Sequence, residues 1–326
     1  MKKITTPLLA LLFLIVSCNK QDLKVSEEVS PDEAETSVIT QRKCGTAEVL
    51  DRQLQEDPTL QKRMADIEIF TEKVAKNPGA YRLVNGVIEI PVVVHVVYKT
   101  TTENISQAQV QSQIDVLNED YGNTNKDKAL IPTEFQSVDA TVGVRFVLDQ
   151  VVRKATTKKS WSTNDAVKKT SLGGSDPVDP VNKLNIWACN LGQGLLGYAQ
   201  FPGGSTATDG VVILYSAFGR TGTLISTYNK GRTATHEVGH WMNLRHIWGD
   251  ASCGNDQVAD TPPAATANYG CPNYPKLTTC TGGKAEMTMN YMDYTDDACM
   301  YMFTNGQKSR MLAVFSATGP RAAIGK

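Results

Sequence analysis

The sequence predicts a mixed α/β sheet domain, and two patterns in its central part lead to that prediction. Residues 87–98 form a nearly continuous run of β-branched side chains, which is typical of a strand buried on both faces of a sheet. Several shorter apolar runs and one segment of helical periodicity follow it. A chain of 326 residues is long enough for one large domain or two small ones.

The first expected elements are helical and precede the sheet. Residues 47–76 carry apolar side chains at near-helical spacing, and Asp57 with Pro58 forms an N-cap and first-turn pair. An Asn-Pro-Gly sequence at 77–79 then breaks the helical pattern. We therefore place a boundary between a leader segment and the main domain near residue 80.

The main domain continues with a helix and further strands. Ser106 can cap a helix after the strand 87–98, and Gly122 can end it. Alternating apolar residues predict a second strand over 142–148. Short apolar runs predict two more strands, over 184–187 and 211–214. Between them the glycine-rich stretch 192–204 must turn sharply.

The charge balance argues against a nucleic-acid partner. The chain has 33 basic and 34 acidic side chains and a net charge of -1. Nucleic-acid binding needs clustered lysine and arginine, which this balance does not supply. Apolar residues at 41% and charged residues at 21% are ordinary globular values.

The N-terminus predicts export. Lys2 and Lys3 precede an apolar run, Leu8–Val16, which is too short to span a bilayer and fits a signal peptide. The run ends at Ser17-Cys18, and the end of this segment resembles a bacterial lipobox, in which the cysteine is acylated. The alternative is an ordinary signal peptide with an incidental cysteine. With acylation, a lipid on Cys18 would be the only contact with a membrane.

Export makes the remaining cysteines candidates for disulfides. Four of them lie in the last quarter of the chain, a loop-rich region in which cross-links stabilise most. Four cysteines allow three pairings, and the spacing alone does not choose among them. These four are Cys253, Cys271, Cys280 and Cys299.

Three of the four histidines lie within one short stretch that carries a metal motif. His236 and His240, in the pattern H-E-x-x-H, share one face of a helix, so both imidazoles can reach one ion. Glu237 lies beside that face and can reach a metal-bound water. His246 supplies a third nitrogen, and three nitrogen ligands with an open fourth position indicate a catalytic zinc site. The alternative is a helix with three structurally satisfied histidines.

The longer motif resembles that of the metzincin metallopeptidases, H-E-x-x-H-x-x-G-x-x-H with a methionine turn downstream. Asn243 stands at the glycine position, and asparagine tolerates the left-handed backbone that this turn requires. Residues 290–294, Asn-Tyr-Met-Asp-Tyr, resemble the methionine turn. The resemblance implies that Met292 forms an apolar floor under the metal. It also implies that Tyr294 ligates zinc or stabilises the oxyanion.

Within the metzincins the chain resembles the pappalysin family. The similar segments are PVVVHVVY, LNIWACNL, LLGYAQFPGG, CGNDQVADTP, NYMDY and MFTNGQKSRM. The resemblance implies a mixed twisted sheet with a long active-site helix and a smaller, irregular, disulfide-bonded C-terminal subdomain. It also implies the pairs Cys253–Cys280 and Cys271–Cys299. Calcium near Asp256 and Asp260 is implied too, with solvated loop carboxylates as the equal alternative.

Residues 42–46, Arg-Lys-Cys-Gly-Thr, resemble the cysteine switch of such proenzymes. A thiolate from Cys44 would fill the fourth zinc position and displace the reactive water. The alternative is a disulfide between Cys44 and Cys189. Cys189 lies in an apolar strand and is otherwise expected to be a buried small hydrophobic residue.

The sequence thus predicts an exported zinc endopeptidase, made as a latent precursor, that hydrolyses protein or peptide substrates. Glu237 would take the proton from the zinc-bound water. The alternatives are a surface lipoprotein that binds a partner and keeps zinc structurally, and another zinc amidohydrolase. The intact Glu237 argues against the first. The predicted parts are a lipoprotein signal peptide, a tether and pro-segment with the switch, and a metallopeptidase domain: 1–18, 19–80 and 81–326.

Overall fold

The computed structural model describes residues 39–76 and 86–324, which belong to one compact unit. The predicted signal peptide, with Cys18, and the boundary expected near residue 80 lie outside the described residues. Among the residues described, no helix is long and apolar enough to cross a membrane.

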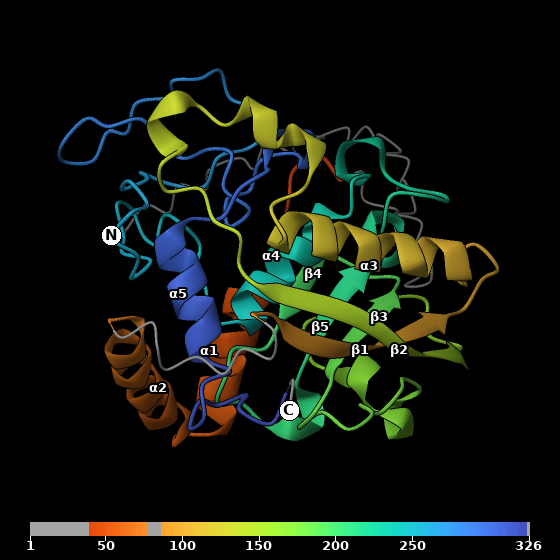
Figure 1. Ribbon diagram of the computed structural model, residues 1–326. Helices are drawn as coiled ribbons and strands as arrows, with labels where there is room; N and C mark the ends of the chain where they lie inside the picture. Colours follow the sequence, from red (N-terminus) through yellow and green to blue (C-terminus); the bar gives the residue numbers. More distant parts are fainter. Residues whose placement is uncertain (1–38, 77–85, 325–326) are drawn as a thin grey trace, which may run out of the picture. The chain divides into compact units, whose positions relative to one another are not determined.

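The unit is built around one five-stranded sheet with the strand order β2-β1-β3-β5-β4 (Figure 1). β2, β1, β3 and β5 pair in parallel, and the short edge strand β4 is antiparallel to β5. The predicted mixed α/β class is therefore confirmed. The strands are β1 Ile88–Tyr98, β2 Val144–Ala155, β3 Leu184–Cys189, β4 Gly197–Ala199 and β5 Val211–Leu214.

The central strands are mostly apolar because both faces of the sheet are covered. In β3, Ile186 and Ala188 belong to the core that the helices complete, whereas Trp187 and Cys189 belong to a second core on the other face. β5 alternates in the same way. Successive residues of a strand point to opposite faces, so a continuous β-branched run satisfies both cores at once.

Within the residues that the structure describes, five α-helices accompany the sheet. α3 and α4 pack against one another and cover the same face of the sheet (Figure 1). The predicted cap of α3 is present, because Ser106 Oγ accepts from the Gln109 amide at 3.1 Å. The helices are α1 Thr46–Glu56, α2 Leu60–Ala75, α3 Gln107–Tyr121, α4 Arg232–Trp241 and α5 Asn305–Ala313. Short 3-10 helices cover Lys126–Leu130, Thr133–Phe135, Ala166–Lys168, Thr170–Leu172, Thr206–Thr208, Tyr215–Ala217, Ser226–Tyr228 and Asp297–Cys299.

One detail of the helical leader was predicted wrongly. The pattern over 47–76 divides into α1 and α2, and α2 begins at Leu60 rather than with Pro58 in its first turn. Asp57 Oδ1 instead accepts from the Thr59 amide at 3.0 Å, which forms a local turn between the helices.

The C-terminal part after α4 is mostly irregular, as expected, and is cross-linked twice. The disulfides are Cys253–Cys280 and Cys271–Cys299, the pairs that the resemblance implied. Cys44 and Cys189 are both free thiols, so the alternative Cys44–Cys189 disulfide is absent. Cys189 lies fully buried in β3.

Candidate active site

α4 and the turn after it bring three imidazoles together. His236 and His240 lie one helical turn apart on α4, and both are buried. The helix ends at Trp241, and Asn243 then adopts the left-handed conformation with φ 74°, as the motif predicted. This reversal returns His246 to the site. The Nε2 atom of His240 lies 3.1 Å from that of His236 and 3.0 Å from that of His246.

An acceptor on its Nδ1 atom orients each of the three rings. His236 Nδ1 donates to the Tyr291 carbonyl at 2.7 Å, and His240 Nδ1 donates to the Leu244 carbonyl at 2.8 Å. His246 Nδ1 lies 2.5 Å from Asp250 Oδ1. The protons therefore lie on the Nδ1 atoms, and three Nε2 lone pairs face one another. This arrangement suits a shared metal ion and not mutual hydrogen bonds.

Burial keeps two of these rings neutral, as a metal ligand must be. Desolvation, with a smaller effect of the neighbouring rings, lowers the pKa of His236 well below its ordinary value. Desolvation likewise lowers the pKa of His240 to about 3. The residues present thus fit a borderline-soft divalent cation such as zinc.

Cys44 supplies a fourth candidate ligand from the N-terminal segment. Its Sγ and one nitrogen of each histidine all lie within 4.8 Å of one another. Backbone pairing with the edge strand β4 holds it there. The Gly45 amide donates to the Gly197 carbonyl, and the Leu196 amide donates to the Lys43 carbonyl, both at 2.9 Å. The segment runs parallel to β4 at this point.

Glu237 lies next to the three histidines. Residues of the same N-terminal segment contact its carboxylate. Its Oε2 accepts from Thr46 Oγ1 at 2.9 Å and lies 3.3 Å from Cys44 Sγ. Thr46 Oγ1 in turn accepts from the Ala199 amide of β4 at 2.8 Å. Burial raises the pKa of Glu237 to about 7. A carboxyl group with that pKa can both accept and return a proton near neutral pH.

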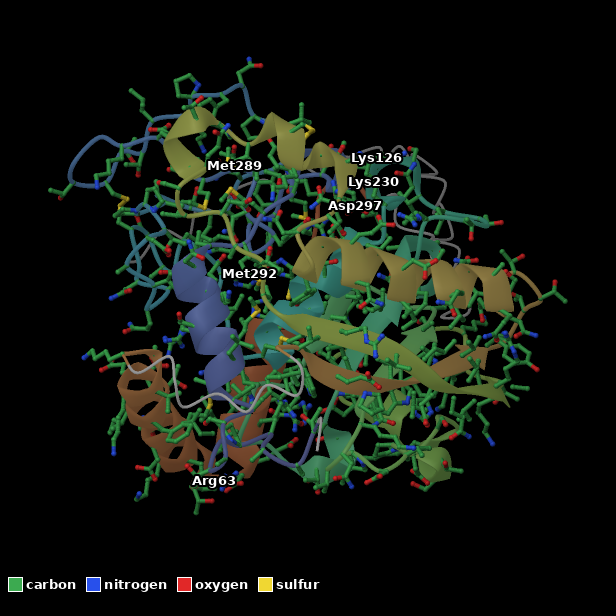
Figure 2. The ribbon with its side chains drawn as sticks, viewed as in Figure 1. Arg63, Lys126, Lys230, Met289, Met292 and Asp297 are labelled. Carbon is green, nitrogen blue, oxygen red and sulfur yellow. A yellow bond between two sulfur atoms is a disulfide. The ribbon has the colours of Figure 1, made fainter. Side chains whose placement is uncertain are left out.

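Residues 290–294, the predicted methionine turn and here called the methionine loop, pass close to α4. A Cβ atom on Gly239 would lie 2.5 Å from Met292 Sδ, so the helix and Met292 approach as closely as only glycine allows. Figure 2 shows Met292 inside this part of the molecule. The Tyr294 ring packs edge-on against Trp248 and His246, with centroid distances of 4.7 and 4.9 Å, and those two rings stack on each other at 4.4 Å. Its hydroxyl lies 3.5 Å from the Cys44 carbonyl oxygen.

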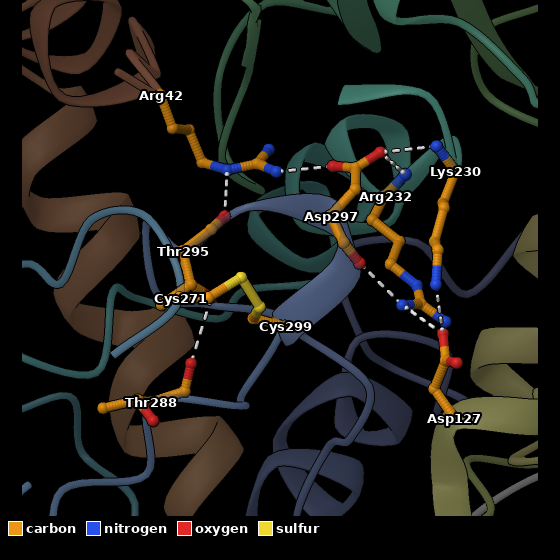
Figure 3. Close-up of a disulfide and its surroundings, with 9 residues drawn as sticks. All are labelled: Arg42, Asp127, Lys230, Arg232, Cys271, Thr288, Thr295, Asp297 and Cys299. Carbon is orange, nitrogen blue, oxygen red and sulfur yellow. Dashed lines mark hydrogen bonds and ion pairs between the residues drawn. A yellow bond between two sulfur atoms is a disulfide. The ribbon is translucent and has the colours of Figure 1, made fainter. Parts of the chain in front are cut away.

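The buried Arg42 side chain, two residues before Cys44, contacts Thr295 and Asp297, as Figure 3 shows. The Arg42 guanidinium donates to the Thr295 carbonyl at 3.1 Å, to Thr233 Oγ1 at 3.1 Å and to Asp297 Oδ1 at 2.7 Å. The second Asp297 oxygen accepts from the backbone amides of Lys230 and Arg232, before and at the start of α4. Among the described residues, Arg42 supplies the charged side chain that pairs with the Asp297 carboxylate, and the other two donors are backbone amides.

The leader helices cover the other side of the cluster. A cavity of about 370 Å³ is bordered by α1, α2, Phe201, His240 and His246. Two arginine pairs fasten these helices to the rest of the chain. Arg310 of α5 forms a two-pronged pair with Glu68 of α2 at 2.6 and 2.9 Å. Arg52 of α1 pairs with Asp165.

The acids predicted to lie near calcium are engaged with their own chain. Asp256 accepts from the Val258 amide at 3.0 Å and from Thr261 Oγ1 at 2.8 Å. Asp260 accepts from Thr304 Oγ1 at 2.6 Å and from the Gly306 amide at 2.8 Å. Within 39–76 and 86–324, one group of histidine, cysteine or acidic side chains is arranged to hold a metal, namely the cluster with Cys44.

Sequence reasoning did not identify Asp250, Asp297 or Asp120 as residues of the site. Asp250 follows the last histidine by four residues, a spacing that would have suggested a partner for His246. Asp297 and Asp120 carry no local signal, because the residues they contact are distant in the sequence.

Comparison with known proteins gives consistent matches. The family model described as "Pregnancy-associated plasma protein-A", of peptidase family M43, matches residues 175–316. An extracellular metalloprotease of Arthroderma otae is 34% identical over 76% of this chain and 86% of its own length. Extracellular metalloprotease 1 of Coccidioides posadasii is 36% identical over 75% of this chain and 84% of its own length.

Two solved structures are similar over most of the chain. Mature mirolysin of Tannerella forsythia, in complex with a cleaved peptide, is 47% identical with a TM-score of 0.71 and covers 73% of this chain and 96% of its own. A promirolysin mutant from the same organism is 43% identical with a TM-score of 0.79 and covers 87% of this chain and 97% of its own. The higher coverage by the precursor form extends the likeness beyond the part shared with the mature form.

Proposed function

Because this chain belongs to the pappalysin family of metalloproteases, peptidase family M43, we propose that His236, His240 and His246 hold a catalytic zinc ion. The observation that carries the proposal is the convergence of three Nε2 atoms, with an acceptor on each Nδ1. Bound there, zinc polarises a carbonyl group and makes water nucleophilic near neutral pH. The protein is a secreted metalloprotease, and peptide bonds are its substrates.

Glu237 is the general base in this proposal. Its buried carboxylate is held beside the cluster and has a pKa of about 7. It would take a proton from the attacking water and later give it to the leaving amine. Tyr294 is assigned to donate a hydrogen bond to the developing oxyanion, because its hydroxyl lies on the same side of the cluster as Cys44.

Replacing Glu237 with Gln tests this assignment. We expect hydrolysis of a peptide by the activated protein to fall roughly 10²- to 10⁴-fold, because proton transfer is lost. The zinc content, measured by mass spectrometry, should equal that of the wild type, because no ligand changes. Glu134→Gln, on an exposed 3-10 helix, is the matched control. A Glu237→Gln enzyme that keeps substantial activity would contradict the assignment.

We also propose that residues 19–80 act as a pro-segment and that Cys44 and Thr46 block the site in two ways. Cys44 Sγ would take the fourth metal position, and Thr46 Oγ1 occupies the base by donating to Glu237. The double variant Cys44→Ala/Thr46→Ala should therefore hydrolyse peptide without activation, and activity should be weaker with Cys44→Ala alone, because Thr46 still occupies Glu237. The same change at free Cys189, fully buried in β3, is the control for losing a thiol. A double variant that stays latent would contradict the proposed block.

The site of Arg42 suggests the class of substrate side chain. Once the pro-segment leaves, the Asp297 carboxylate loses its charged partner, and a substrate residue that covers it again without a positive charge would bury an unpaired charge at a cost. A substrate arginine or lysine next to the scissile bond would replace Arg42. We expect peptides with arginine at that position to be cleaved faster than peptides with leucine or glutamate. Asp297→Asn should remove the preference for arginine. If the variant still prefers arginine, the proposed role of Asp297 in substrate selection is contradicted.

A lipid anchor and a calcium ion stay predictions. Mass analysis of the exported protein would detect acyl chains on Cys18. The carboxylates of Asp256 and Asp260 lie in the irregular region where the resemblance implies calcium. If calcium binds there, the melting temperature of the protein should rise with the calcium concentration. A melting temperature that does not change with calcium would contradict this prediction.

A further inference from the structure

A carboxylate behind the metal site joins the two elements that place His236. Asp120, at the end of α3, is buried with 3% of its surface exposed. Its Oδ1 accepts from the Tyr291 hydroxyl at 2.7 Å. Its Oδ2 accepts from Thr235 Oγ1 at 2.8 Å. One side chain therefore holds α4 and the methionine loop at the same time.

Both of these contacts lead directly to the ligand. Thr235 is the residue immediately before His236 on α4, and Tyr291 is the residue whose carbonyl accepts from His236 Nδ1 at 2.7 Å. The phenol of Tyr291 and its carbonyl thus connect Asp120 to the imidazole through a single residue. Met292 follows Tyr291 and touches Gly239, so a shift of this loop would also disturb the floor of the site.

We propose that Asp120 is a positioning residue of the metal site, which fixes α4 against the methionine loop so that His236 presents Nε2 to the metal. The inference rests on the proposed metal role of His236. Asp120 itself does not reach the reacting atoms. It acts by keeping the hydrogen bond between His236 and Tyr291 in place, as the outer hydrogen-bond partners of metal ligands do.

The surroundings of Asp120 indicate that both hydroxyl contacts are well determined. Asn125 donates to the Tyr291 hydroxyl at 3.1 Å, so this oxygen accepts from Asn125 and has its one proton left for Asp120. The Tyr121 hydroxyl donates to the Thr235 carbonyl at 3.0 Å, which adds a second tie from α3 to the same turn of α4.

Burying a carboxylate at this position costs folding free energy. A purely stabilising role for Asp120 does not explain why the chain has an ionisable residue there. Arg232 is the nearest cation, with its Nε 3.8 Å from Asp120, but it pairs more closely with Asp127 at 2.8 Å. Burial raises the pKa of Asp120 to about 6 despite these favourable contacts. An apolar residue in its place would avoid that cost, but it would not accept from two hydroxyl groups.

Zinc retention measured without turnover tests the proposal. We would incubate the full chain with a chromogenic chelator and compare the rate of zinc loss from Asp120→Ala, Asp120→Asn and the wild type. We expect Asp120→Ala to release zinc about 10- to 100-fold faster, by analogy with other outer partners of metal ligands. Asp120→Asn, whose amide can still serve both hydroxyls, should restore most of the retention.

Asn118→Ala is the matched control. Asn118 lies two residues earlier on α3 and makes two hydrogen bonds of its own, both to the backbone of Phe146 in β2. The Asn118→Ala change should lower the melting temperature of the zinc-free protein without changing the rate of zinc release. If Asp120→Ala does not fold, Tyr291→Phe removes one contact with little change in volume and should release zinc faster than the wild type.

Three results would overturn the proposal. The first is zinc release at the wild-type rate from Asp120→Ala, or from Tyr291→Phe if Asp120→Ala does not fold. The second is equally fast zinc release from Asn118→Ala, and the third is that Asp120→Asn does not restore zinc retention. These failures differ from a failure of the proposed function. If the wild-type protein holds no zinc, the function is wrong. If it holds zinc that Asp120 does not influence, only the positioning role is wrong.

Discussion

Replacing Arg42 with Ala should raise the fraction of latent protein in which the N-terminal segment has left the site. The contacts of Arg42 indicate the size of this increase. The Arg42 guanidinium makes three hydrogen bonds, and its side chain and that of Asp297 are 1% and 0% exposed. In the wild type, closure of the pro-segment buries a matched pair. In Arg42→Ala, closure buries the Asp297 carboxylate without a charged partner. Removing one partner of a buried ion pair costs about 3–5 kcal/mol.

This cost falls on the closed state, because an open Asp297 is hydrated in both proteins. With about 1.4 kcal/mol for each factor of ten, the open fraction should rise roughly a hundredfold to a few thousandfold. The assay is the rate at which a thiol reagent labels Cys44 in the uncleaved protein. Cys189, the other free thiol in the part of the chain that the structure describes, is fully buried in β3 and contributes little signal.

The neighbouring lysine provides the control. Lys43 is exposed, and its ammonium group makes one long contact to the Gln193 carbonyl at 3.4 Å, so Lys43→Ala should label at the wild-type rate. Arg42→Lys keeps the charge but not the forked geometry and should label at an intermediate rate. Equal labelling of Arg42→Ala and the wild type would refute the reasoning, because it would mean that the buried pair does not hold the segment.

Three further predictions concern the same region. Asp250→Ala should weaken zinc binding about 10- to 100-fold in a chelator competition, because His246 Nδ1 loses its acceptor, while Asp250→Asn should weaken it less. Burial raises the pKa of Asp256 from 3.8 to about 6, so the folded protein holds a proton that the unfolded chain releases between these values. Its stability contribution is therefore lost as the pH rises from about 4 to 6, and the unfolding free energy of Asp256→Asn relative to the wild type should rise by up to about 3 kcal/mol over that range. Gly239→Ala should destabilise by about 1–3 kcal/mol in denaturant unfolding because its Cβ meets Met292, and Met292→Ala in the same chain should relieve part of that loss.

Local chemistry explains why the zinc motif and its helix were predictable. The spacing of His236 and His240 needs only the helical repeat, and the reversal at Asn243 needs only a residue that tolerates positive φ. The cap at Ser106 is equally local. The division of the leader into α1 and α2 was missed because Asp57 satisfies the Thr59 amide in a turn that periodicity does not distinguish from a helix start.

The polar residues around the site were not predictable in the same way. Asp297 lies beside Arg42, and Asp120 lies beside Thr235, only because the sheet and the disulfide-bonded loops bring distant segments together. An aspartate on a helix or a loop carries the same sequence signal whether it is solvated or buried with a partner. The partners that orient His236 and His240 are backbone carbonyls, which any residue type supplies.

X-ray absorption at the zinc edge, recorded before and after activation, tests the central claim most directly. The claim is that His236, His240 and His246 hold the ion and that Cys44 closes the fourth position only in the latent form. We predict three nitrogen neighbours at about 2.0–2.1 Å and one sulfur at about 2.3 Å in the latent protein. After activation the sulfur should be replaced by an oxygen, with the nitrogens unchanged. A latent protein without the sulfur neighbour, or an active enzyme that keeps it, would contradict the account.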